Sequence, residues 1–402
     1  MNSLGRAAGS ILAIATLAIA PVSADRADAA DNIVVGFAVA KSGWMEIFDT
    51  PAKNAAQLKI DEINASGGLL GRQITTIEAD TKTEVAEGAK AAESLLDQGV
   101  DMLVVSCDYD MGVSAALAAE RAGVVSFFLC AEDIKAGKQG VGPHSFTGSV
   151  VANVQGATMA DWAYEDRKAK SAYLLIDTSI EYNKSVCAGF EWQYPQLDGA
   201  AIVGKDTFVN SDASIASQIT RIKSLPQEPD VIMMCSYAPG GASAAKQIRA
   251  AGIKSAILNG TAMDGTYWLD AAPGLKDFFV TVQGSVRGDD PRPEVNAFVQ
   301  AYAAKYGAPP PNQALFGGVV LIEMWKRAVE AANAVDADSV TGELEKLTDV
   351  STLVGTRSFT PDLHIQNIAT YLISSVDNGK VTVVGEKRLK APIPLDVLMA
   401  RH

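Results

Sequence analysis

Residues 53–72 read KNAAQLKIDEINASGGLLGR, and this stretch decides how the chain around it is organised. Ala56, Ile60 and Ile63 recur at helical spacing, which predicts an amphipathic helix with one buried face. Two consecutive glycines follow and predict the end of that helix. The stretch is therefore expected to be one helix of a strand–helix unit, since β-rich runs lie on both sides of it.

The same alternation of short β-rich runs and longer helical patterns continues along the chain. The first series has predicted strands at 33–39, 74–79, 102–106 and 124–130. The second series has predicted strands at 172–177, 200–208, 231–235 and 256–259. Such alternation indicates an α/β fold with parallel central sheets, and two series of similar rhythm indicate two lobes of similar topology.

No low-complexity linker follows residue 30, so we expect the lobes to be joined by short crossovers. These crossovers are predicted near residues 147–150, 283–287 and 355–359. The predicted N-terminal lobe comprises 31–147 plus 285–356, and the predicted C-terminal lobe comprises 148–284 plus 357–402. The cleft between lobes is the expected ligand site, because open α/β sheets bind ligands at the carboxyl ends of their strands.

The first 30 residues have the layout of a secretory signal peptide. Arg6 precedes an apolar run at 11–20, and small residues follow it up to Ala30. A membrane-spanning helix needs about 20 apolar residues, so residues 1–30 are predicted to be a cleaved signal rather than an anchor. We therefore expect a periplasmic protein without direct membrane insertion.

The charge of the chain excludes several kinds of partner. The 402 residues include 34 Lys and Arg against 47 Asp and Glu, for a formal charge of −13. This acidic balance argues against nucleic acid and anionic membranes as partners. His144, His364 and His402 lie too far apart for a local metal motif, so neither a metal nor a cofactor is expected. A monomer is expected.

Four cysteines, Cys107, Cys130, Cys187 and Cys235, leave their pairing open. An even number in an exported chain permits disulfides, and four cysteines allow three connectivities. Cys107 and Cys130 end consecutive predicted strands, which makes them candidates for a pair at one sheet edge. Four buried free thiols is the alternative.

Several motifs together resemble one protein family. They are IVVG at 33–36, LKIDEINASGGLLGR at 58–72, ERAGV at 120–124 and GTRSF at 355–359. With them, the chain resembles periplasmic solute-binding proteins of ABC importers of the branched-chain amino acid (leucine-binding) type. The resemblance implies the type I fold, with two Rossmann-like lobes joined by three crossovers. It also implies capture of a small-molecule solute, delivery to an inner-membrane permease, and no enzymatic activity.

The resemblance also shows where this chain departs from the family pattern. In relatives, Ser or Thr residues after the third strand and backbone groups after the fourth hold the solute's α-carboxylate. This chain has CDYDM at 107–111 and LCAE at 129–132 in those places. A carboxylate about 4 Å from an anion costs on the order of 1 to 4 kcal/mol. We therefore expect a polyol, sugar-like or cationic solute rather than an aliphatic amino acid.

Nine residues are candidates for contact with the solute. Tyr182 matches the family's cleft tyrosine, Tyr237 follows the strand that supplies another, and Asp264 is the acid nearest to the family's ammonium-binding position. The full set is Trp44, Asp108, Tyr109, Asp110, Cys130, Ala131, Tyr182, Tyr237 and Asp264.

Two of these candidates have structural alternatives. Trp44 is predicted either to stack on the solute or to be a half-buried loop residue. Asp108 or Asp110 is predicted either to accept hydrogen bonds from the solute or to cap the helix that follows.

Two other functions share this sequence pattern. A cleft hydrolase would use Asp108 and Asp110 as acid and base. However, the sequence has no Gly-x-Ser-x-Gly motif, and no histidine lies near these two acids to activate a nucleophile. An enzyme is therefore not expected. A sensor that presents its solute to a membrane receptor would have the same fold and the same cleft.

Overall fold

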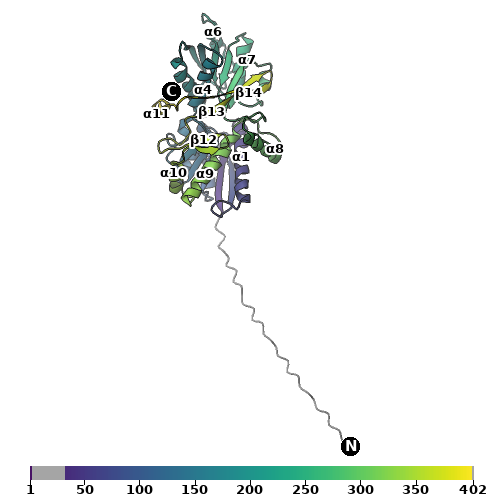
Figure 1. Cartoon of the computed structure of the whole chain (residues 1–402), viewed down its shortest axis with the longest axis vertical. Helices are drawn as coiled ribbons and strands as arrows, with labels where there is room; N and C mark the ends of the chain where they lie inside the picture. The colour runs from purple at the N-terminus through teal and green to yellow at the C-terminus, as the bar shows by residue number, and fades with distance from the viewer. Residues whose placement is uncertain (2–31, 401–402) are drawn as a thin grey trace. The chain divides into compact units, whose positions relative to one another are not determined.

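The computed structural model describes Met1 and residues 32–400, and the chain from Asn32 onward belongs to one compact unit (Figure 1). Residues 2–30 of the predicted signal peptide lie outside the described residues. Within the compact unit, two separate sheets, one parallel and one mostly parallel, form the centres of two lobes.

The first lobe is built on a five-stranded parallel sheet of order β2-β1-β3-β4-β5. Its strands are β1 (Ile33–Val39), β2 (Ile74–Asp80), β3 (Met102–Val105), β4 (Val125–Phe128) and β5 (Ser145–Thr147). β3 and β4 are buried along their whole length, which accounts for their continuous apolar sequences.

Helices from both ends of the chain cover this first sheet. They are α1 (Glu46–Ala65), α2 (Val85–Leu96), α3 (Tyr109–Ala122), α8 (Pro293–Tyr306), α9 (Leu315–Ala332) and α10 (Ala337–Leu344). One face packs against α1 and α9, and the other packs against α2 and α3. A Cβ atom on Gly318 of α9 would lie 1.9 Å from the Ala52 carbonyl of α1, so only glycine permits this helix contact.

The second lobe has a seven-stranded sheet of order β14-β13-β10-β9-β8-β6-β7. Its strands are β6 (Ser171–Asp177), β7 (Ala201–Phe208), β8 (Val231–Cys235), β9 (Ala256–Asn259), β10 (Phe278–Val282), β13 (Thr370–Asp377) and β14 (Lys380–Arg388). Strands β6 to β10 are parallel, whereas β13 and β14 extend the sheet as an antiparallel pair. The predicted α/β class with two Rossmann-like lobes is confirmed.

The remaining helices and a small hairpin complete the described chain. The helices are α4 (Ala152–Glu165), α5 (Glu181–Gln193), α6 (Ala216–Lys223), α7 (Gly240–Ala250) and α11 (Leu395–Met399). Single 3₁₀ turns lie at Ile134–Ala136, Tyr194–Gln196, Thr261–Met263 and Leu269–Ala271. The hairpin consists of β11 (Val350–Thr352) and β12 (Gly355–Arg357).

All four cysteines are paired. Cys107 forms a disulfide with Cys130, and Cys187 forms one with Cys235. The pairing considered for Cys107 and Cys130 is thus present, and the alternative of four free thiols is wrong. The first disulfide joins the segments that follow β3 and β4, at the edge of the sheet where the lobes meet.

Arg357 connects the three segments that pass between the lobes. Its guanidinium is buried and donates hydrogen bonds to the carbonyl of Gly148 at 2.6 Å and to the side-chain oxygen of Gln283. Burial lowers the pKa of Arg357 to about 10. One charged group therefore holds the three crossover segments together, next to the pocket between the lobes.

Candidate functional site

A pocket lies between the lobes, where strands of both sheets end. It contains about 550 Å³ of space, part of it open to solvent, and 17 residues line it. The first lobe contributes the loops after β1, β3 and β4, and the second lobe contributes the segments after β6, β8 and β9. This is the position at which open α/β sheets bind small molecules.

Six of the nine candidate residues line this pocket. They are Trp44, Asp108, Tyr109, Cys130, Tyr182 and Tyr237. They come from five different strand ends, so the strand-to-helix connections bring together residues nearly 200 positions apart.

The other three candidates lie outside the pocket lining. Asp110 accepts a hydrogen bond from the backbone N–H of Glu181, across the lobe boundary, at 2.8 Å. The Asp264 side chain has no exposed surface and forms an ion pair with Arg287 at 2.5 Å. Ala131 is buried, and its carbonyl accepts a hydrogen bond from Thr147. The carboxylates of Asp110 and Asp264 thus have partners within the protein.

The candidate set omitted Glu132, a buried carboxylate that lines the pocket. Its Oε2 atom accepts hydrogen bonds from Gln155 at 2.8 Å and from Thr261 at 2.7 Å. Its Oε1 atom accepts one from Gln283 at 3.2 Å. Burial raises the pKa of Glu132 to about 7. The only sequence signal for it was its place in the segment after β4, two residues after Cys130.

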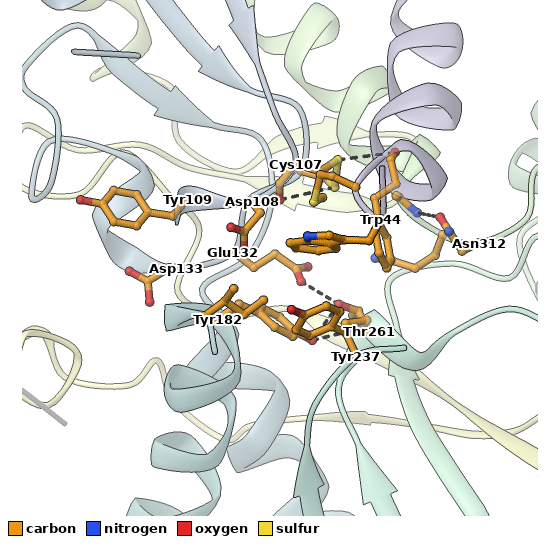
Figure 2. A pocket seen from close by; sticks show the side chains of 17 residues that line it. Trp44, Cys107, Asp108, Tyr109, Glu132, Asp133, Tyr182, Tyr237, Thr261 and Asn312 are labelled. Carbon is orange, nitrogen blue, oxygen red and sulfur yellow. Dashed lines mark hydrogen bonds between the residues drawn. A yellow bond between two sulfur atoms is a disulfide. The ribbon is translucent and has the colours of Figure 1, made fainter. Parts of the chain in front are cut away.

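Figure 2 shows the Glu132 side chain extending from the first lobe toward Thr261 of the second. Two of its three hydrogen-bond donors, Gln155 and Thr261, belong to the second lobe. Glu132 therefore both lines the pocket and links its two walls.

Asp108 and Asp133 add two more carboxylates from the first lobe. Asp108 caps α3 by accepting a hydrogen bond from the N–H of Met111 at 3.2 Å, and it also lines the pocket. Burial and the neighbouring Asp110 raise the pKa of Asp108. Asp133 accepts a hydrogen bond from Ser185 of the second lobe at 2.5 Å. The capping alternative for Asp108 is confirmed, and it is compatible with a place in the pocket.

A fourth carboxylate, Asp49, accepts hydrogen bonds from backbone N–H groups at the ends of β1 and β3. It is fully buried and accepts hydrogen bonds from the N–H groups of Ala40 and Cys107, both at 2.7 Å, and from Ser106 at 3.1 Å. Burial raises the pKa of Asp49 to about 6. Since Asp49 lies within α1, the helical pattern gave no sign of this role. An internal carboxylate thus uses the donors where β1 and β3 end.

Aromatic rings from both lobes meet in the pocket. The rings of Trp44 and Tyr237 lie 4.6 Å apart, and one comes from each lobe (Figure 2). The Tyr182 hydroxyl donates to Gln155 at 2.8 Å and accepts from the N–H of Ala262 at 3.2 Å. These contacts give the pocket apolar ring faces beside its carboxylates.

None of the described residues that line the pocket is Lys, Arg or His. The nearby Lys135 forms an ion pair with Glu181 at the pocket's edge, and Arg357 is bound to the crossover segments. Among residues 32–400, no group of His, Cys, Asp and Glu is arranged to hold a metal ion. The described pocket lining therefore contains acidic and aromatic side chains and no basic one.

Comparison with protein families identifies the fold's relatives. Residues 32–380 match the family model described as periplasmic binding protein. The chain belongs to the periplasmic binding protein family. A relative within this family, the Leu/Ile/Val-binding protein BraC3 of Rhizobium johnstonii, is 26% identical over 367 residues, which cover 89% of this chain and 94% of BraC3. The family resemblance expected from the sequence is confirmed.

Solved structures of family members have the same fold. The branched-chain amino acid binding protein LivJ of Streptococcus pneumoniae, in complex with isoleucine, has a TM-score of 0.77 and 26% identity; the match covers 90% of this chain and all of LivJ. A solute-binding protein of Rhodopseudomonas palustris in complex with 3,4-dihydroxy benzoic acid has a TM-score of 0.75 and 20% identity, with 91% and 99% coverage. Both of these proteins are described as binding proteins of transporters. In residues 32–400, no helix has the length and apolarity required to cross a membrane.

Proposed function

We propose that this protein is the periplasmic binding subunit of an ABC importer and captures a small polar solute between its lobes. The observation that carries the proposal is the pocket itself, which is lined by strand-end residues of both sheets. The similarity to LivJ over the whole of that chain supports it. The solute is an amino acid or a related polar, polyol, sugar-like or cationic molecule.

The mechanism is closure about the crossover segments. The solute first contacts the first-lobe residues Trp44, Asp108 and Glu132, and groups of the second lobe then select the closed form. Three contacts between the lobes support closure of one lobe on the other: Asp110 with the N–H of Glu181, Asp133 with Ser185, and Trp44 with Tyr237. The closed surface is then recognised by an inner-membrane permease.

A ligand screen tests the proposal. Mature protein, unfolded and refolded to remove retained solute, is screened by thermal shift against amino acids, polyols, sugars, polyamines and aromatic acids. A solute present at 100 times its Kd adds about 2.7 kcal/mol of stability. Small-angle scattering with the hit should show a decrease in the radius of gyration. A panel without any hit would contradict solute capture.

A further inference from the structure

We propose that the solute is a small organic ammonium ion without a carboxylate group, bound with its charge beside Asp108 and its apolar part against Trp44 and Tyr237. This inference rests on the proposed function and specifies the class of solute for the same pocket. Four observations support it, and each concerns a different property of the pocket.

The first observation is the unbalanced charge of the lining. Asp108, Glu132 and Asp133 line the pocket, and no described lining residue carries a positive charge. All three carboxylates are buried, with exposed fractions of 5%, 6% and 2%. A buried carboxyl group either keeps its proton or needs a positive partner, and a cationic solute would supply the partner that these acids lack within the pocket lining. An anionic solute would increase the imbalance.

The second observation is that three hydrogen-bond donors at the ends of β1 and β3 are already used within the protein. The N–H groups of Ala40 and Cys107 and the hydroxyl of Ser106 all donate to Asp49. Asp49 is fully buried and accepts all three of these hydrogen bonds. At the ends of β1 and β3, the protein therefore satisfies these donors itself and leaves them unavailable to an external carboxylate.

The third observation is the unequal hydrogen bonding of the carboxylates. Glu132 accepts three hydrogen bonds from side chains and Asp133 accepts one. Asp108 accepts a side-chain hydrogen bond from no described residue; its capping bond comes from the backbone of Met111. Asp108 thus has the most acceptor capacity left for an N–H donor of the solute, and Glu132 contributes through its charge.

The fourth observation is the aromatic pair. Trp44 and Tyr237 face each other from opposite lobes with ring centroids 4.6 Å apart. Ring faces attract cations as well as apolar groups, and this attraction grows when water is excluded. Carboxylates on one side and ring faces on the other suit an ammonium ion with a short alkyl chain.

The test uses probes of matched shape and different charge. Leucine is compared by isothermal titration calorimetry with 3-methylbutylammonium, which is leucine without its carboxylate, and with 4-methylpentanoate, which is leucine without its amine. Tetramethylammonium separates charge and ring contacts from N–H donation. We expect 3-methylbutylammonium to bind at least tenfold more tightly than leucine or 4-methylpentanoate. Tighter binding of leucine or 4-methylpentanoate would overturn the inference.

Asp108→Asn is the decisive variant, because asparagine also caps helices and should preserve the start of α3. We expect it to weaken binding of 3-methylbutylammonium about ten- to hundredfold and to leave the melting temperature of the free protein unchanged or higher. Asp338→Asn removes an acid whose side chain is 94% exposed, and should leave affinity unchanged. Equal affinity of Asp108→Asn and the unmodified protein would overturn the inference.

The failures of the two proposals are distinguishable. A neutral or anionic solute that binds and closes the lobes would contradict the ammonium inference and support solute capture. If none of the four probes binds and the broad screen gives no hit, both the ammonium inference and solute capture would be contradicted.

Discussion

The two walls of the pocket differ in charge although they come from lobes of similar topology. The first-lobe wall carries Asp108, Glu132 and Asp133, whereas the second-lobe wall presents neutral groups such as Tyr182 and Thr261. Closure therefore brings hydroxyls and rings toward carboxylates and avoids contact between like charges. Under the ammonium inference, the first lobe would bind the solute's charge and the second lobe would complete the hydrogen bonds.

The second lobe also has an acid at a strand end, but that acid is turned away from the pocket. Asp177 ends β6 and is fully buried. It accepts hydrogen bonds from the side chains of Asn210 and Ser236, both at 2.7 Å. A carboxylate at a strand end therefore does not always line the pocket, because neighbouring donors can bind it within its own lobe, as they do for Asp177.

Removing the acid that links both walls should have the largest effect. Glu132→Ala leaves donors on Gln155, Thr261 and Gln283 buried without their acceptor, and should lower the free energy of unfolding by about 4 kcal/mol. Urea unfolding followed by tryptophan fluorescence measures this loss. Glu386→Ala, at an exposed position of β14, is the control and should change stability by less than about 0.5 kcal/mol. Equal losses would show that Glu132 does not link the walls.

The pH dependence of stability should reveal the same acid. Burial raises the pKa of Glu132 from its ordinary 4.5 to about 7, against the opposing effects of its hydrogen bonds and of Arg357. Between pH 4.5 and 7, Glu132 keeps its proton in the folded state and loses it in the unfolded state. The resulting stabilisation of the folded state is complete below pH 4.5 and is lost as the pH rises through 7. The loss amounts to about 3 kcal/mol.

Unfolding of ligand-free protein between pH 5 and 8 tests this dependence. Stability should fall with rising pH, and the fall should be smaller in Glu132→Gln. Asp49, whose raised pKa of about 6 acts in the same direction, is retained in that variant, so the difference between the two curves reports Glu132. Superimposable curves would show that Glu132 titrates at an ordinary pKa.

A smaller effect is expected on the neutral wall. Tyr182→Phe removes a hydroxyl that donates to Gln155 and accepts from the N–H of Ala262, and should destabilise the protein by about 1 to 2 kcal/mol. Tyr194→Phe is a matched control, because the Tyr194 hydroxyl is buried without a hydrogen-bond partner and its removal should be neutral or stabilising. Chemical unfolding of both variants checks the difference, and a reversed order would contradict the assigned bonds.

The smallest predicted effect concerns the ring pair across the walls. Trp44→Leu should weaken binding of 3-methylbutylammonium about tenfold, since the cation loses a ring face. Trp44→Phe keeps a ring and should recover part of that loss. Calorimetric titration of both variants measures the effect, and similar affinities in the two would indicate that Trp44 contributes apolar area alone.

The sequence was most informative about elements with a clear period. The helix predicted from Ala56, Ile60 and Ile63 is α1, and all three side chains are buried. The predicted strands of both series are present. The inner strands β3, β4, β8 and β9 are buried along their whole length, so their continuous apolar runs fit sheets covered on both faces. Six pocket residues were also found in advance, since strand ends of parallel sheets meet at one edge.

The sequence was least informative about the direction of polar side chains. Asp264 and Glu132 both follow strands, yet Asp264 pairs with Arg287 and Glu132 lines the pocket. Arg287 lies 23 positions beyond Asp264 in the chain, and no local pattern predicts their meeting. Asp49 was missed for the same reason, because its donors lie on two other segments.

By itself, the sequence therefore determined the α/β class, the two-lobed family and the loops that border the cleft. These properties follow from local periodicity and from strand order, which short segments encode. Only the tertiary structure decided the cysteine pairs, the internal use of Asp49 and the acids that line the pocket. Those depend on donors and charges that packing brings together from distant parts of the chain, and burial then sets the energetic cost of each unpaired group.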